Sequence, residues 1–210
     1  MRSEGRGQGR PSFWRWFVVL MLLGLVLGCG GCSQQGGSKG RTTAGTGAYS
    51  VTDEAGRTVH FTGKPQRIVS LTYGTDEILT ALVDVQRLAA YSKWAGDPEI
   101  TFITQAQAAR VGHKLAENNV EAVVALQPDL IVLSTSSPEG VVKAFTDMGL
   151  RVYVAASPKT YAAMQKKITG LAAAVGEPEQ GQKIVADMDQ ELAAIQKPLQ
   201  RLQPEQERIA

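Results

Sequence analysis

The stretch Arg67-Ile-Val-Ser-Leu71 is a short apolar run that leads directly into a segment with helical periodicity, residues 75–85. The apolar side chains of that segment recur three or four residues apart, at Ile78, Leu79, Leu82 and Val85. Another short run, Leu130-Ile-Val-Leu133, is apolar on both faces, as buried parallel strands are. Runs of this kind predict strands at 67–71, 88–91, 109–111, 130–133 and 151–154, separated by helices at 75–85, 98–108, 119–126, 138–148 and 160–175.

Five strands that alternate with helices predict an α/β fold, here a Rossmann-like three-layer lobe with a mostly parallel five-stranded sheet. A small β-hairpin precedes the lobe, with strands 50–53 and 57–61 around the turn Glu54-Ala-Gly56. Ligands of such sheets bind beyond the carboxyl ends of the strands. We therefore look for binding residues in the loops that follow the strands.

A long helix is predicted after the lobe, because residues 178–202 place apolar side chains three or four apart on one face. Pro198 is expected to kink or end it, since proline cannot donate the helical hydrogen bond. The domain boundaries that follow are a lobe over 49–176, the long helix over 177–205, and the opening of another strand over 206–210.

The first residues are predicted to be a secretory signal, residues 1–28. Their apolar run is about thirteen residues long, whereas a membrane span needs roughly twenty, although a short transmembrane anchor is the alternative. Val26-Leu27-Gly28-Cys29 resembles the bacterial lipobox, so Cys29 is the expected lipidation site, and Cys32 is the competing one. Residues 29–48 are rich in Gly, Ser and Thr and are expected to form a flexible tether.

Composition excludes several classes of protein. Residues 1–28 hold four of the 22 basic residues and one of the 20 acidic residues, so the remainder holds 18 and 19 and is nearly neutral. A nucleic-acid binder is therefore not expected. Two His and two Cys are too few for an all-protein Cys/His zinc site. The first strand-to-helix turn, residues 71–75, contains one Gly and no nucleotide loop, so we expect no enzyme.

Five segments in register resemble the substrate-binding proteins of ABC importers for iron-siderophores, haem and cobalamin. The resemblance lies in residues 52–59, 64–71, 75–79, 119–133 and 148–154. It implies two α/β lobes joined by one long helix, with a small metal-chelate ligand held between the lobes and no cofactor besides that ligand. This chain matches the first lobe and the joining helix, and the second lobe is expected to be missing.

The resemblance also implies partners and a location. The expected partners are an ABC permease and its ATPase, and the expected location is the outer face of the cytoplasmic membrane, reached through the lipid anchor. Glu121 matches the acidic residue of this family that docks on arginines of the permease. Its alternative role is that of an acid favoured by the helix dipole. The alternative function is a membrane-anchored interaction module without a role in transport.

Four residues in the loops after the strands are candidates for the ligand site: Tyr73, Lys93, Trp94 and Lys114. Aromatic rings can pack on a flat corrin, porphyrin or catecholate, and lysines can meet ligand carboxylates. Ordinary surface roles remain the alternative for each of them. His113 is a loop residue that could touch a metal, and His60 is expected to be structural, so no metal site is predicted.

Overall fold

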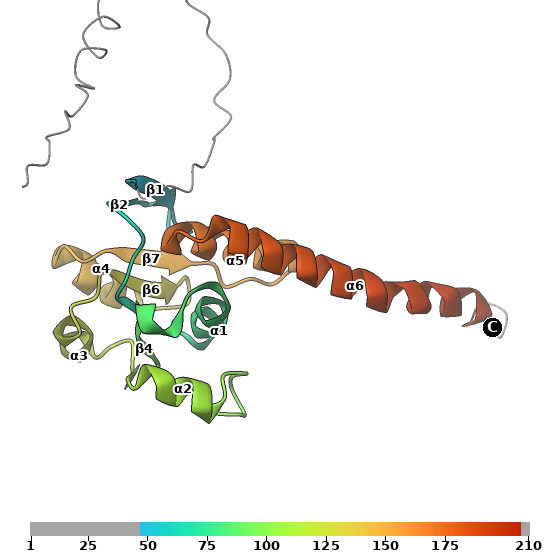
Figure 1. Ribbon diagram of the computed structural model, residues 1–210, viewed down its shortest axis with the longest axis horizontal. Helices are drawn as coiled ribbons and strands as arrows, with labels where there is room; N and C mark the ends of the chain where they lie inside the picture. Colours follow the sequence, from blue (N-terminus) through green and yellow to red (C-terminus); the bar gives the residue numbers. More distant parts are fainter. Residues whose placement is uncertain (1–46, 207–210) are drawn as a thin grey trace, which may run out of the picture. The chain divides into compact units, whose positions relative to one another are not determined.

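The structure is a computed structural model that describes residues 47–206 (Figure 1). It is an α/β fold with a five-stranded parallel sheet, a two-stranded antiparallel hairpin and a long C-terminal helix. The predicted fold class is therefore confirmed. The predicted signal, residues 29–46 of the tether with Cys29 and Cys32, and residues 207–210 of the predicted last strand lie outside the described residues, and Gln206 belongs to the long helix.

The five strands are β3 (Ile68–Ser70), β4 (Leu88–Ser92), β5 (Lys114–Leu115), β6 (Leu130–Ser134) and β7 (Val152–Ala155). Their order across the sheet is β5-β4-β3-β6-β7, and all four pairings are parallel. The strands β4 and β5 therefore follow on one side of β3, and β6 and β7 lie on its other side. The switch point of the sheet lies between β3 and β6, where a crevice opens beyond the carboxyl ends of the strands.

Six α-helices and one 3₁₀ turn are described between residues 47 and 206. The helices are α1 (Tyr73–Leu82), α2 (Gln105–Val111), α3 (Val120–Ala125), α4 (Glu139–Asp147), α5 (Tyr161–Val175) and α6 (Pro178–Gln206), and the turn is η2 (Val85–Arg87). No helix within this part of the chain is long and apolar enough to span a membrane.

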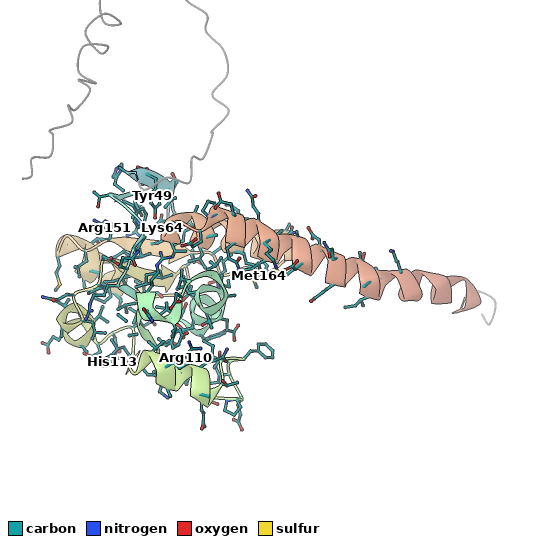
Figure 2. All side chains as sticks on the ribbon, viewed as in Figure 1. Tyr49, Lys64, Arg110, His113, Arg151 and Met164 are labelled. Carbon is teal, nitrogen blue, oxygen red and sulfur yellow. The ribbon has the colours of Figure 1, made fainter. Side chains whose placement is uncertain are left out.

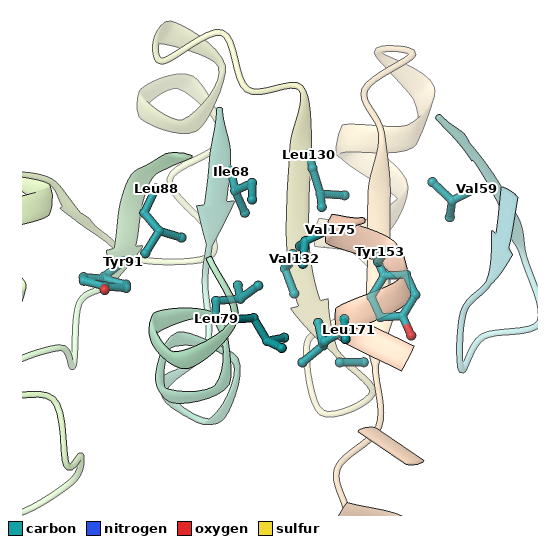
Figure 3. Close-up of a cluster of buried hydrophobic side chains, with 14 of the residues drawn as sticks. Val59, Ile68, Leu79, Leu88, Tyr91, Leu130, Val132, Tyr153, Leu171 and Val175 are labelled. Atoms are coloured by element: carbon teal, nitrogen blue, oxygen red, sulfur yellow. The ribbon is translucent and has the colours of Figure 1, made fainter. Parts of the chain in front are cut away.

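Apolar side chains pack against both faces of the sheet because neighbouring residues of a strand point to opposite sides. Leu130 and Val132 of β6 pack with Leu79 of α1 and Leu171 of α5 (Figure 3). The next residues along the strand face the other way, where Ile131 and its neighbours pack with residues of α3 and α4, among them Val123 and Phe145. This arrangement gives the three layers that the strand pattern predicts.

The hairpin consists of β1 (Tyr49–Thr52) and β2 (Thr58–Phe61), as predicted. Its turn is fixed by the buried carboxylate of Asp53, which accepts the backbone N–H of Arg57 at 2.9 Å and that of Val154 at 3.2 Å. The second bond joins the turn to β7 and attaches the hairpin to the lobe.

The predicted strand 109–111 is wrong, because these residues belong to α2. Thr104 and Gln107 form a capping box that starts the helix at Gln105, later than predicted. Gly112 ends it with a left-handed φ of 82°. The third strand of the parallel sheet in chain order is the two-residue β5, which is too short to show a period in the sequence.

The long helix α6 lies along α5 and extends beyond it (Figure 1). The two helices approach closely at Gly181, where an added Cβ would lie 2.3 Å from the Cβ of Ala172. Of the two effects expected of Pro198, an end of the helix is wrong, since α6 continues to Gln206. Farther along the helix Ile195 is 60% exposed.

Candidate functional site

Two adjoining cavities lie beyond the carboxyl ends of β3 and β6, at the switch point of the sheet. The first, which we call the aromatic cavity, has a volume of about 360 Å³ and is lined by Tyr73, Lys93 and Trp94. The second, which we call the lysine cavity, has a volume of about 460 Å³ and is lined by Lys167. Tyr73 lines both, so it stands between them.

The turn between β3 and α1 positions Tyr73 at this edge. The hydroxyl of Thr75 lies 2.8 Å from the hydroxyl of Ser70 and 2.8 Å from that of Thr72. These bonds tie the last residue of the strand to the first turn of the helix. Tyr73 is the first residue of α1, and its side chain is 51% exposed.

Lys93 and Trp94 follow β4 directly, and the end of that strand is held by α1. The buried carboxylate of Asp76 accepts the backbone N–H of Ser92 at 3.1 Å and its hydroxyl at 2.5 Å. The backbone N–H of Lys93 donates to Leu115 at 2.8 Å. The ammonium of Lys93 then lies 4.3 Å from the centre of the Trp94 ring, a cation–π contact at the rim of the aromatic cavity.

Asp76 is a structural residue that the sequence analysis did not single out. Burial raises the pKa of its carboxyl to about 7, and the hydrogen bonds that the carboxylate accepts from Ser70 and Ser92 oppose that rise. An acid in the first turn of a helix is normally read as a surface residue favoured by the dipole. The neighbouring Glu77 has a similar role, because its carboxylate accepts the hydroxyl of Thr101 and the N–H of Phe102, both at 2.9 Å.

The structure places the fourth candidate, Lys114, apart from the other three. Lys114 is exposed and lines a separate hollow beside Gly112 and Ala108. The next residue of β5, Leu115, lines the aromatic cavity instead. Alternate residues of a strand point to opposite faces, which explains the separation.

Glu121 lies in the first turn of α3 and is exposed. Asn119 caps the start of this helix, because its side-chain oxygen accepts the N–H of Ala122 at 3.2 Å. Val123 of the same helix is fully buried against the sheet. The helix is therefore anchored to the lobe while Glu121 remains exposed.

Lys167 of α5 lines the lysine cavity together with Met164 of the same helix, which is labelled in Figure 2. Only 6% of Lys167 is exposed. The sequence analysis missed it, although the pattern holds a signal: Lys167 comes three residues after Met164 and four before the buried Leu171, on the apolar face of the helix.

The described part of the chain, residues 47–206, holds no cluster of three His, Cys, Asp or Glu side chains suited to a metal ion. The ring of His60 bonds the hydroxyl of Ser50 at 2.7 Å across the hairpin. His113, labelled in Figure 2, is exposed after α2, and its carbonyl accepts the N–H of Tyr91.

The sequence profile of the periplasmic binding protein family matches residues 68–209, which include all five strands of the parallel sheet. The chain belongs to the periplasmic binding protein family. Members of this family are solute-binding proteins and do not form a class of enzymes.

Two relatives from Bacillus subtilis align with most of this family member. The uncharacterized ABC transporter substrate-binding lipoprotein YvrC is 25% identical over 202 residues, which are 92% of this chain and 60% of YvrC. The probable siderophore-binding lipoprotein YfiY is 26% identical over 87% of this chain and 54% of its own length. The chain therefore spans a little more than half the length of these relatives.

Solved structures share the fold over a similar portion. A periplasmic haem-binding protein from Pseudomonas aeruginosa matches 68% of this chain and 50% of its own, with a TM-score of 0.53 and 23% identity. The vitamin B12-binding protein BtuF of Vibrio cholerae matches 62% of this chain and 49% of its own, with a TM-score of 0.52 and 27% identity.

Proposed function

We propose that this periplasmic binding protein is the solute-binding component of an ABC importer for an iron-siderophore, haem or cobalamin-type ligand. The observation that carries the proposal is the convergence of Tyr73, Lys93 and Trp94 on one cavity at the switch point of the sheet. That cavity combines aromatic faces with a cation, which suits a flat metal chelate with anionic groups.

The ligand would bind without covalent chemistry. Tyr73 and Trp94 are 51% and 38% exposed, so both rings have free surface to offer to a macrocycle or a catecholate. The Lys93 ammonium, already over the Trp94 ring, would meet an anionic edge of the ligand. We propose further that Glu121 docks on an arginine pocket of the permease, and that Cys29 carries the lipid that holds the protein at the membrane.

A fluorescence titration tests the ligand proposal. Trp94 is the only tryptophan after residue 16, so quenching by a bound chelate reports on this cavity. The chain is produced in a bacterial host, extracted in detergent and titrated with ferric siderophores, haem and cyanocobalamin, beside a Trp94→Phe control. Saturable quenching that the control lacks supports the proposal. If none of these chelates binds saturably, the proposal is overturned and an interaction module is favoured.

A further inference from the structure

The lysine cavity contains a largely buried cation that forms no hydrogen bond or ion pair with the described residues, Glu77 being the one carboxylate in its lining. Only 6% of Lys167 is exposed, so more than nine-tenths of the residue is buried. No hydrogen bond or ion pair joins its Nζ to any residue from 47 to 197. Burial lowers the pKa of this ammonium, and the nearby Glu77 carboxylate partly opposes that effect. Glu77 is itself engaged, because it accepts the hydroxyl and N–H of the 101–102 segment.

The start of α1 adds further positive potential at the same place. The Nζ of Lys167 lies beside Gly74, since a Cβ built on that glycine would be 3.2 Å from it. The side chain of Thr72 does not cap the helix, and no described residue accepts the N–H groups of Tyr73 and Gly74. Free N–H groups at a helix start attract anions, and the ten-residue helix directs its dipole toward the cavity.

Hydroxyl groups from the end of β6 and from the loops after β6 and β7 also line the lysine cavity. They belong to Ser134 at the end of β6, to Ser136 after it and to Ser157 after β7. The hydroxyls of Ser134 and Ser136 bond each other at 2.6 Å, so one of these two and the Ser157 hydroxyl can donate to an anion that the ammonium and the N–H groups attract. No carboxylate other than that of Glu77 lines this cavity.

We propose that the lysine cavity binds a carboxylate group of the ligand, held by the Lys167 ammonium and the Tyr73 and Gly74 N–H groups. The Nζ of Lys167 forms no ion pair with the described residues and is not sealed from the cavity, so a ligand carboxylate could reach it and form a charge-assisted hydrogen bond. The proposal rests on the proposed function in taking the carboxylate to belong to a metal chelate. It predicts that the protein binds chelates that carry carboxylates, such as ferric citrate or haem with its two propionates, in preference to uncharged chelates.

The site can be tested without metal by the melting temperature of the full chain in millimolar citrate. The variants are Lys167→Met, which keeps the bulk of the side chain, and Lys166→Met as the matched control. Lys166 is 72% exposed by its side chain and pairs with Glu54 at 3.0 Å on the surface. Citrate should raise the melting temperature of the wild type and of Lys166→Met, and it should leave Lys167→Met unchanged beyond the general effect of the salt.

A second arm separates the free acid from the chelate. Ferric citrate and cyanocobalamin are titrated into the same three proteins. Loss of a charged hydrogen-bond donor should weaken ferric citrate about tenfold or more in Lys167→Met, while Lys166→Met stays within about twofold of the wild type. Without ligand, Lys167→Met should melt no lower than the wild type, which also shows that it folds.

The two proposals fail in different ways. A citrate response that is equal in the wild type and Lys167→Met overturns the carboxylate site, even where chelates bind. Binding of cyanocobalamin with no response to citrate or ferric citrate overturns it as well and leaves the proposed function standing. A Lys167-dependent citrate response without binding of any chelate supports the site and overturns the proposed function.

Discussion

The carboxylate of Asp76 accepts both the backbone N–H and the hydroxyl of Ser92, at 3.1 and 2.5 Å, inside the protein. This pair joins the first turn of α1 to the last residue of β4. The next two residues of the chain are Lys93 and Trp94, which line the aromatic cavity. The buried pair thus fixes the relative position of Tyr73, at the start of α1, and of the two residues after β4.

The elevated pKa of Asp76 predicts a pH dependence of stability. The native carboxyl has a pKa of about 7, against 3.8 for the unperturbed group, so the native state keeps a proton that the unfolded state releases. Stability is therefore favoured below about pH 4 and falls as pH rises to about 7, by an amount of the order of 4 kcal/mol. Asp76→Asn cannot ionise and should lose less stability over that range.

Chemical denaturation of both proteins between pH 4 and 8 measures this effect. The stability of the wild type relative to Asp76→Asn should decline with rising pH. A difference that stays constant or grows with pH would show that Asp76 is ionised throughout in the native state.

Sequence patterns predict the layers of this fold well. A continuous apolar run such as 130–133 indicates a strand buried on both faces, and an amphipathic segment such as 160–175 indicates a helix with one buried face. These patterns fail for a charged residue that can lie either at the surface or inside the protein. Asp76 has the position of a surface acid at a helix start, yet tertiary packing buries it under β4. The burial of Lys167 depends likewise on α1, which meets it only in the folded chain.

The candidate site was likewise predictable from the sequence only in part. The loops after β3 and β4 could be placed at one edge because parallel strands end together. Lys114 could not be separated from them, since the start of β5 depends on the end of α2 at Gly112 and on the pairing of β5 with β4.

The contact between α5 and α6 predicts a sensitive glycine. A methyl group at Gly181 would lie 2.3 Å from the Cβ of Ala172, so Gly181→Ala must push the two helices apart. We expect a loss of about 1–3 kcal/mol in unfolding free energy. Gly140→Ala in α4 is the control, because its methyl group meets no atom within 4 Å and should stabilise by up to about 1 kcal/mol. Equal melting temperatures of the two variants would contradict this packing.

The docking role of Glu121 predicts a separation of uptake from binding. Glu121→Arg in cells that depend on this protein should reduce uptake of its chelate strongly, because the new charge repels an arginine pocket. The affinity of the purified variant for the ligand should be unchanged, and its stability should move by no more than about 0.5 kcal/mol. Glu139→Arg is the control, an exposed acid in the first turn of α4. Normal uptake by Glu121→Arg would remove this residue from docking.

The lipid anchor predicts the behaviour of two cysteine variants. Cys29→Ser should release the protein from membranes into the soluble fraction, whereas Cys32→Ser should remain attached. Fractionation of cells expressing each variant measures this. Release by Cys32→Ser alone would move the lipidation site to Cys32, and retention of both variants would favour the apolar segment of residues 16–28 as the anchor.

The central claim is that the aromatic cavity binds a metal chelate, and the titration of Trp94 fluorescence tests it most directly. We expect saturable quenching by at least one of ferric siderophores, haem or cyanocobalamin, weakened at least about tenfold in Tyr73→Ala and unchanged in Lys114→Ala, whose side chain lies outside the cavity. Saturable binding that Tyr73→Ala leaves unchanged, or no binding to any of these chelates, would contradict the claim.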